Sequence, residues 1–246
     1  MVGGTVTYRH ISVAVHGPWG AGKSWFGDTA PGPRLILDAE GGTLDTPSNK
    51  IEWDPHNDIP KVGEDDTVHV LVRGWNDIEL VRAVLMTGKH PIDSIVVDSL
   101  TEIQKRLKDR LSGGPEVIFD QQAWGKLLNH MEQFVRELRD HTWADAIHPI
   151  NMVVVTGTDD ERVPMKPMFQ GGLRKSYAGF FDVVGYITPE RDTDGNKAWH
   201  MQIEPTQAVV AKCRLHEVSV QYPGGVVLNP TMGKLLAPVN PGGRDG

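Results

Sequence analysis

Hydrophobic residues in the first two thirds of the chain fall into short runs separated by longer segments with helical spacing. The runs are rich in β-branched residues and lie at 11–16, 34–40, 68–72, 93–98 and 152–156. The run DSIVVD at 93–98 is apolar throughout between its acidic ends, which is typical of a strand covered on both faces. This alternation, up to about residue 157, predicts an α/β fold with a mostly parallel central sheet flanked by helices.

The segments between these runs carry apolar residues at helical spacing. Helices are expected from about residue 24, from Asn76, after Ser99 and after Asp120. Ser99 and Glu102 have the spacing of a capping box, and Asp120 is a typical N-cap residue. One stripe of the longest helix is expected in the core: Trp124, Leu127, Leu128, Met131, Val135 and Leu138.

The pattern changes beyond residue 157. A polar loop at 158–172 is followed by strand-like runs at 183–188, 198–203, 207–213 and 216–221. These runs predict antiparallel β-hairpins after the parallel core. We expect one domain over 1–225, with 41–67 mostly loop, and a C-terminal extension over 226–246 whose end is disordered.

The bulk composition is that of a soluble globular protein. Hydrophobic residues make up 39% and charged residues 23% of the 246 positions, and no apolar run approaches the ~20 residues of a membrane helix. Cys213 is the single cysteine, which excludes an internal disulfide and fits a reducing cytoplasm. The net charge is −7, so nucleic-acid binding requires local basic loops or a surface built by oligomerisation.

The segment HGPWGAGKSW carries the most specific chemical signal. Residues 17–24 fit the pattern G-x-x-x-x-G-K-[ST], between a predicted strand and a predicted helix. The glycines let backbone N–H groups point into one concavity that holds the phosphates of ATP, with Lys23 on the β- and γ-phosphates and Ser24 on Mg²⁺. Trp25 is expected to pack under the loop. The predicted nucleotide-binding segment is Gly17, Pro18, Trp19, Gly20, Ala21, Gly22, Lys23, Ser24 and Trp25.

Two acidic strand ends complete the predicted catalytic site. Asp98 closes the apolar run SIVVD, the Walker B arrangement in which the acid holds Mg²⁺ beside Ser24. Glu40 ends LILDAE, and parallel strands open toward the same crevice at their carboxyl ends. Glu40 is our candidate for the base that orients or deprotonates water. Asp38 shares that crevice, with a structural role the more favoured interpretation.

Together, the phosphate loop, DAE and VVDS resemble the RecA-like ATPases in spacing. That resemblance implies a RecA-like P-loop NTPase core, ATP hydrolysis with Mg²⁺, Glu40 as the catalytic base and Asp98 as the Walker B aspartate. It also implies a polar sensor at Thr156, in VVVTG. The compact length resembles the Sak-type single-strand annealing ATPases of bacteriophages, which implies a role in recombination and a bacterial host cytoplasm.

RecA-like recombinases carry a mobile loop after the sensor strand that contacts single-stranded DNA. The matching stretch here is 158–170, whose basic side chains are suited to phosphates and whose aromatic ring is suited to a base. The GGLRKSY segment at 171–177 offers a further basic pair. The DNA-binding candidates are Arg162, Lys166, Phe169, Arg174 and Lys175.

The segment AKCR resembles the lysine-x-arginine element with which DnaB-like and RadA-like proteins reach a neighbouring subunit's nucleotide. That resemblance implies trans-acting roles for Lys212 and Arg214, and self-association into a ring or a filament. A single-strand-binding protein is a further candidate partner. Only about ten residues precede the first strand, whereas RecA filaments depend on an N-terminal docking segment, so a ring or short oligomer is as well supported as a filament.

Three other functions remain open at the level of sequence. A DnaB-like helicase or translocase requires a stable ring and duplex unwinding. A P-loop phosphotransferase usually carries an arginine-rich lid, of which the chain has only fragments. A nucleotide-gated binding module would bind ATP with negligible turnover.

Overall fold

The central feature of the fold is one large, mostly parallel sheet. The structure is a computed structural model that describes residues 8–113, 119–161, 163–170, 172–191 and 195–243. In these residues ten strands form the sheet, with β12, β10, β9, β1, β6, β5, β2, β4 and β3 in order and β11 paired to β9. The strands are β1 (Ser12–His16), β2 (Arg34–Asp38), β3 (Lys50–Glu52), β4 (Thr67–Leu71), β5 (Ser94–Asp98), β6 (Asn151–Val155), β9 (Val183–Arg191), β10 (Lys197–Gln202), β11 (Lys212–Cys213) and β12 (Val226–Leu228).

Neighbouring strands from β3 through β9 pair in parallel, and β10, β11 and β12 pair antiparallel. A separate two-stranded ribbon joins β7 (Thr158–Asp159) to β8 (Lys166–Pro167). The predicted α/β class, with a mostly parallel sheet and antiparallel C-terminal strands, is confirmed.

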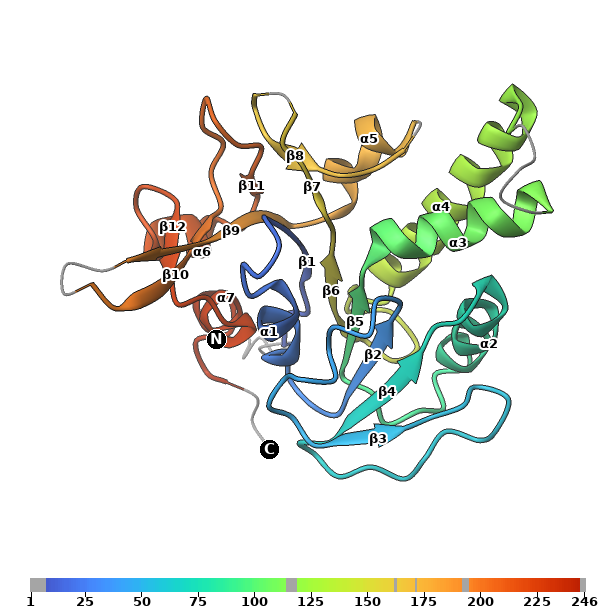
Figure 1. Cartoon of the computed structure of the whole chain (residues 1–246). Coiled ribbons are helices and arrows are strands. Elements are labelled where there is room, and N and C mark those ends of the chain that lie inside the picture. Colours follow the sequence, from blue (N-terminus) through green and yellow to red (C-terminus); the bar gives the residue numbers. More distant parts are fainter. Residues whose placement is uncertain (1–7, 114–118, 162, 171, 192–194, 244–246) are drawn as a thin grey trace.

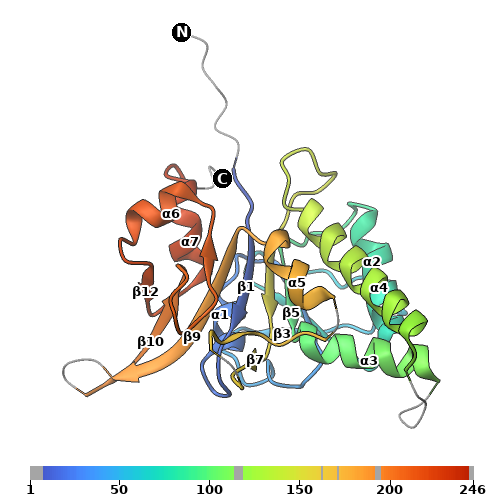
Figure 2. The ribbon, with the colours of Figure 1, turned by 90° about the horizontal axis from the view of Figure 1, so that it is seen from above.

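Helices cover both faces of the sheet, as Figures 1 and 2 show. The helices are α1 (Lys23–Asp28), α2 (Trp75–Met86), α3 (Leu100–Ser112), α4 (Gln121–Asp140), α5 (Leu173–Ser176), α6 (His216–Gln221) and α7 (Met232–Val239), with a 3-10 turn at Tyr177–Phe180. Alternate strand residues feed two cores, because successive side chains of a strand point to opposite faces. Leu35 and Leu37 pack with α2, α3 and α4, whereas Ile36 packs with α1, α6 and α7.

The segment 216–221, predicted as a strand, is the helix α6. The alternation in HEVSVQ suggested a strand, but Val218 is fully buried whereas Val220 is 65% exposed. Packing of Leu215 and Val218 against the α7 side of the core outweighs the β propensity of the valines. Of the run 207–213, only the last two residues pair as β11, and β3 lies within the predicted loop 41–67.

The predicted C-terminal extension contributes β12 to the sheet and α7 to the core. Met232, Leu235 and Leu236 of α7 are buried in the cluster that contains α1. Asn240 binds the other end of the chain, since its side chain accepts from Arg9 N at 2.7 Å and donates to Arg9 O at 3.0 Å. A division at residues 225 and 226 stays a prediction.

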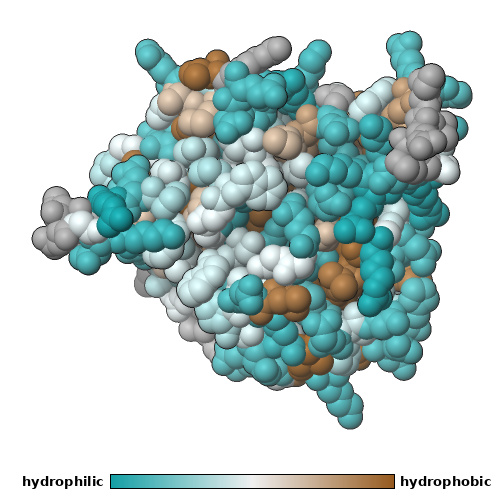
Figure 3. All heavy atoms as spheres, in the orientation of Figure 1, coloured by the Kyte–Doolittle hydropathy of each residue, from teal (hydrophilic) through white to brown (hydrophobic). Residues whose placement is uncertain are grey.

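The face of the molecule drawn in Figure 3 is mainly hydrophilic, with separate hydrophobic areas rather than one continuous band. Within the described residues, no helix combines the length and hydropathy that crossing a lipid bilayer requires.

Candidate nucleotide-binding site

The glycine-rich segment forms the loop between the carboxyl end of β1 and the start of α1. Gly22, directly before α1, has a φ of 88°, a left-handed conformation that favours glycine. A Cβ there would also lie 2.9 Å from Nε1 of Trp199, so the site admits no side chain. Gly22 is therefore required by both conformation and space.

Lys23 folds back over this loop. Its Nζ donates to the carbonyl oxygens of Gly17 and Pro18, each at 2.9 Å. Burial lowers the pKa of Lys23, while the charges of Asp98 and Glu40 act in the opposite direction. The ammonium group is thus partly desolvated beside two acids and held by neutral oxygens that phosphate oxygens can replace.

Asp98 provides an oxygen ligand of the kind that Mg²⁺ prefers. Burial raises the pKa of Asp98 to about 6, against a hydrogen bond from the Ser24 hydroxyl. Its Oδ2 is buried and has no hydrogen-bond partner within the described residues. A buried carboxylate oxygen without a donor, next to the serine hydroxyl, fits a magnesium ion held by Ser24 and Asp98.

The register of the sheet sets the spacing of the site. Val155 of β6 pairs with both Val15 of β1 and Asp98 of β5. One strand therefore separates the loop-bearing strand from the Asp98 strand, and Thr156 follows at its carboxyl end. Thr156 is fully buried and its hydroxyl donates to Gly157 O at 3.0 Å. The predicted sensor thus lies between loop and metal acid.

Glu40 lies beyond the end of β2 with an exposed side chain. Its carboxylate accepts a hydrogen bond from the hydroxyl of Ser99, the residue that follows Asp98. Ser99 is also the N-cap of α3, where its Oγ accepts from Glu102 N at 3.2 Å. This contact ties the Glu40 carboxylate to the residue next to Asp98, and its role as a base stays a prediction.

Asp38 has a structural role in this geometry. Its buried carboxylate accepts backbone N–H bonds from Glu40, Gly41 and Thr43 at 2.6 to 3.1 Å, a hydroxyl bond from Thr43 and a bond from His69. Burial alone would raise its pKa, but the bonds from His69, Thr43 and Gly41 lower the pKa of Asp38 to about 2. The oxygens of the Asp38 carboxylate are occupied by hydrogen bonds that hold the segment containing Glu40 in place.

Arg106 is a positioning residue that the sequence reasoning missed. From α3 it donates to Ala39 O at 2.8 Å and to Arg73 O at 2.9 Å, which ties the Glu40 segment to the helix. Its spacing in a helical stripe carried no signal of this contact, because the partner carbonyls come from segments more than 30 residues away.

His16 connects the phosphate loop to the C-terminal part of the chain. Burial lowers the pKa of His16 to about 4, so the imidazole is neutral. Nε2 lies 2.8 Å from the carbonyl oxygen of Val210, which can only accept, and Nδ1 lies 3.2 Å from Thr158 Oγ1. These partners assign the proton to Nε2, with Nδ1 accepting from the threonine hydroxyl.

Acid is expected to destabilise the fold between about pH 6.5 and pH 4. The pKa values of His16 and His90 are both lowered to about 4 by burial. Below pH 6.5 the unfolded chain binds protons that the folded chain refuses, so the free energy of unfolding falls by about 2 kcal/mol per histidine at pH 5. Urea titrations at pH 7.5 and pH 5 measure this loss.

His90→Gln should reduce the pH dependence of stability, because it removes one of the two groups. The matched control is His56→Gln, which changes an exposed histidine. A His90→Gln protein with the pH dependence of the wild type would contradict the assignment.

The two tryptophans of the loop segment are exposed. Trp19 is 84% exposed, with its ring centroid 5.9 Å from Lys23 Nζ, and Trp25 is 58% exposed on α1. The expectation that Trp25 packs under the loop is wrong, since Phe26 and Gly27 fill that side of α1.

The predicted DNA-contacting residues are placed differently from one another. Lys166 lies in β8 opposite Asp159 of β7, and Lys175 is exposed on α5, whereas Arg174 forms an ion pair with Asp159 at 2.6 Å. Phe169 requires a correction: it is 6% exposed and packs against Tyr177 in the core, so it is not placed to stack on a base. Arg162 lies outside the described residues.

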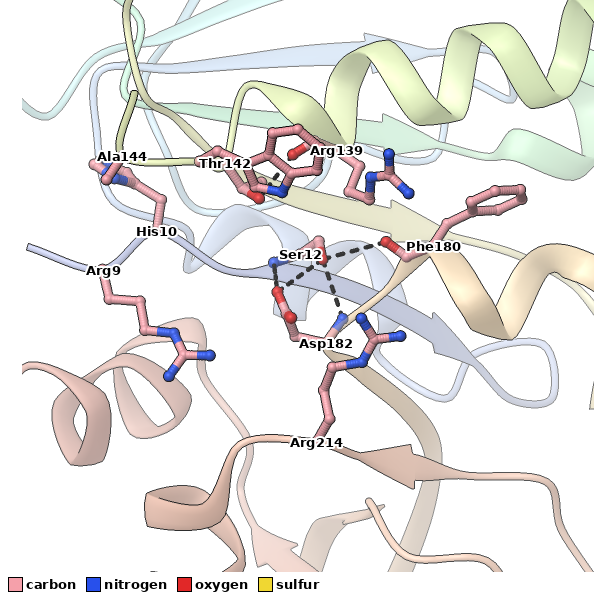
Figure 4. Close-up of a pocket in the computed structure, with 10 residues that line it drawn as sticks. Arg9, His10, Ser12, Arg139, Thr142, Ala144, Phe180, Asp182 and Arg214 are labelled. Atoms are coloured by element: carbon pink, nitrogen blue, oxygen red, sulfur yellow. Dashed lines mark hydrogen bonds between the residues drawn. The ribbon is translucent and has the colours of Figure 1, made fainter. Parts of the chain in front are cut away.

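Lys212 and Arg214 lie toward the opposite end of the sheet. Lys212 donates to the carbonyls of Ala178 and Phe181, and Arg214 to that of Gly179 at 3.0 Å. Arg214 lines a pocket of about 390 Å³ near the start of β1, and Figure 4 shows it with Arg9 and Arg139 around this pocket. Five strand residues separate this level from the phosphate loop, about 17 Å, so Arg214 cannot reach its own chain's loop.

A glycine-rich loop after β1, a buried Walker B acid on β5 and one strand between them define a P-loop nucleoside triphosphatase. The family model of an AAA domain, AAA_24, matches residues 9–215, and the chain belongs to this family. It is therefore an ATP-binding and ATP-hydrolysing P-loop domain that works with Mg²⁺. Among curated proteins, none matches the chain.

Proposed function

We propose that this domain is an ATPase dependent on single-stranded DNA that acts in homologous recombination or strand annealing, like the Sak-type phage proteins that it resembles. One observation carries the proposal. The ribbon that holds Lys166 continues directly from the sensor strand: Gly157 N donates to Thr101 Oγ1 at 3.0 Å, and Met168 N donates to Gly157 O at 2.8 Å. Thr101 is two residues from Ser99, which binds Glu40. DNA contacts and the catalytic base are thus linked through a few hydrogen bonds.

In this function each site residue has a distinct task. Lys23 moves from its loop carbonyls to the β- and γ-phosphates. Ser24 and Asp98 would hold Mg²⁺, which would supply positive charge to the phosphates when bound. Glu40 orients the attacking water and accepts its proton, so that the bond between the γ-phosphorus and the bridging oxygen breaks to give ADP and phosphate. Thr156, which follows the strand between the loop and Asp98, is the proposed sensor of the γ-phosphate.

Completion of the site by a second copy is part of the proposal. Arg214 is remote from its own phosphate loop and lies in an open pocket, as a group that serves a neighbouring subunit would. Lys212 acts in the same contact once it leaves its two carbonyl partners. A ring or filament is the assembly proposed, and a single-strand-binding protein is the proposed accessory partner.

Single-stranded DNA at low salt is expected to raise the ATPase rate and, with ATP, the particle size. Lys166→Ala and Lys175→Ala should each lower the logarithmic salt dependence of DNA binding by about 1, since each removes one phosphate contact. Lys89→Ala, which changes an exposed lysine after α2, is the matched control. ATPase assays, fluorescence anisotropy and light scattering measure the three quantities.

An ATPase rate unchanged by saturating single strands would overturn the DNA-dependent function. Strand displacement from a duplex would instead identify a helicase motor, and phosphate transfer to a metabolite would identify a phosphotransferase.

A further inference from the structure

The hairpin of β9 and β10 borders the phosphate loop at both of its ends. The carbonyl oxygen of Ile187 on β9 occupies the place of a Cβ on Gly17, and the indole edge of Trp199 on β10 lies against Gly22. No motif in the sequence marks this contact, because the hairpin comes some 165 residues or more after the loop. The wall of the site on this side is therefore built by Trp199 and its neighbours.

Trp199 is held firmly in this position. Its backbone N donates to Asn229 Oδ1 at 3.1 Å, and Asn229 N donates to Trp199 O at 2.6 Å. The indole packs against the core cluster of α1, α6 and α7, and Lys197 Nζ lies 4.9 Å from its ring centroid. A side chain fixed in this way loses little conformational entropy when it binds a ligand.

The polar atom of this indole lacks a partner. Trp199 Nε1 is buried, and no acceptor among the described residues lies within hydrogen-bond distance. An indole N–H can only donate, and buried donors in folded proteins are almost always satisfied. Since Nε1 lies beside Gly22, an oxygen or nitrogen of a molecule bound at the phosphate loop is the natural acceptor.

The order of the strands indicates which part of the nucleotide reaches Trp199. Asp98 and Glu40 lie on β5 and beyond β2, on one side of β1, so the metal and the terminal phosphate belong there. The hairpin of β9 and β10 lies on the other side of β1. The nucleoside end of a triphosphate that spans the loop therefore points toward Trp199.

We propose that Trp199 donates its indole N–H to the nucleoside moiety of the bound nucleotide, at a ribose oxygen or a base acceptor atom. The inference rests on the ATP-binding function of the site. It makes the β9–β10 hairpin, rather than the phosphate loop alone, the element that distinguishes a nucleotide from a bare polyphosphate. The exposed ring of Trp25, next to Ser24, offers apolar surface on the same helix start.

The test compares ATP with inorganic triphosphate, which lacks ribose and base. Trp199→Phe keeps an aromatic ring but removes the N–H. Calorimetric titrations with Mg²⁺ present should show ATP binding weakened about tenfold, the effect of one lost hydrogen bond. Triphosphate binding should stay within about twofold, since phosphate recognition is intact. Trp143→Phe, which changes a half-exposed tryptophan after α4, should alter neither.

An equal loss for both ligands would show that Trp199 only braces the loop, and it would overturn the proposal, as would unchanged ATP binding. If Trp199→Phe does not fold, the wild-type protein still decides the question, because triphosphate that binds as tightly as ATP contradicts any nucleoside contact. A wild-type protein that binds ATP more tightly than inorganic triphosphate supports a contact with the nucleoside. A wild-type protein that binds neither ligand removes the nucleotide-binding function, and this inference with it.

Discussion

Lys23→Ala is expected to weaken ATP binding by about 100-fold or more and to abolish measurable turnover. The side chain supplies the charge-assisted hydrogen bonds to the β- and γ-phosphates, and each such bond contributes about 1.5–3 kcal/mol. The fold should keep its stability, because the partly buried ammonium group binds only two loop carbonyls that face the site. Binding of a fluorescent ATP analogue and phosphate release measure the two effects.

Lys89→Ala is the matched control for this substitution, since it removes a lysine at the end of the molecule away from the loop. Circular dichroism and the melting temperature show whether Lys23→Ala retains the native fold. A folded Lys23→Ala protein that hydrolyses ATP at the wild-type rate would refute the assignment of this loop as the phosphate site.

Glu40→Gln is expected to lower the rate of hydrolysis by about 10²- to 10⁴-fold with ATP affinity nearly unchanged. The amide oxygen can still accept the Ser99 hydroxyl, so the segment keeps its geometry, but the amide cannot take a proton from water. Single-turnover hydrolysis under saturating ATP, alongside calorimetric binding, separates the chemical step from affinity.

Glu64→Gln, in an exposed loop, controls for the loss of one negative charge. Hydrolysis that survives in Glu40→Gln would place the base elsewhere. Asp38 is a poor substitute, because its oxygens are already occupied by bonds from Thr43, His69 and the backbone that follows. Lys23→Ala and Glu40→Gln together therefore distinguish a defect in ATP binding from a defect in the chemical step.

The parts of the fold that sequence could predict are those encoded by local patterns. Strands such as β5 are apolar at every position because both faces are covered, and the cap at Ser99 follows from the helix end beside it. The phosphate loop is equally local, since a glycine-rich turn and its lysine are contiguous. The role of Phe169 and the strand at 216–221 were wrong predictions for the opposite reason, since the burial of Phe169 and the packing of α6 depend on elements distant in sequence.

The same reasoning explains the incomplete prediction of the site. The sequence predicted that the carboxyl ends of parallel strands share one crevice, and the register places Asp98 opposite Asp38 of β2 and Val155 of β6, the residue before Thr156. Contacts made by Arg106 and Trp199 could not be anticipated, because each depends on main-chain atoms contributed by another part of the fold. The ion pair of Arg174 with Asp159 could not be predicted from the sequence either, because the two residues are 15 positions apart.

Ser99 serves two partners with one oxygen atom, since its hydroxyl both caps the N-terminus of α3 and donates a hydrogen bond to Glu40. With Glu40 as the proposed base, we expect the thermal stability of the protein and its rate of hydrolysis to change together when Ser99 is substituted. A substitution at Ser99 that improves the helix cap but lacks a hydroxyl donor would raise the thermal stability and remove the hydrogen bond to Glu40. Among the other residue types, threonine alone offers the same donor and acceptor at this length of side chain. Selection for one trait would be visible in the other.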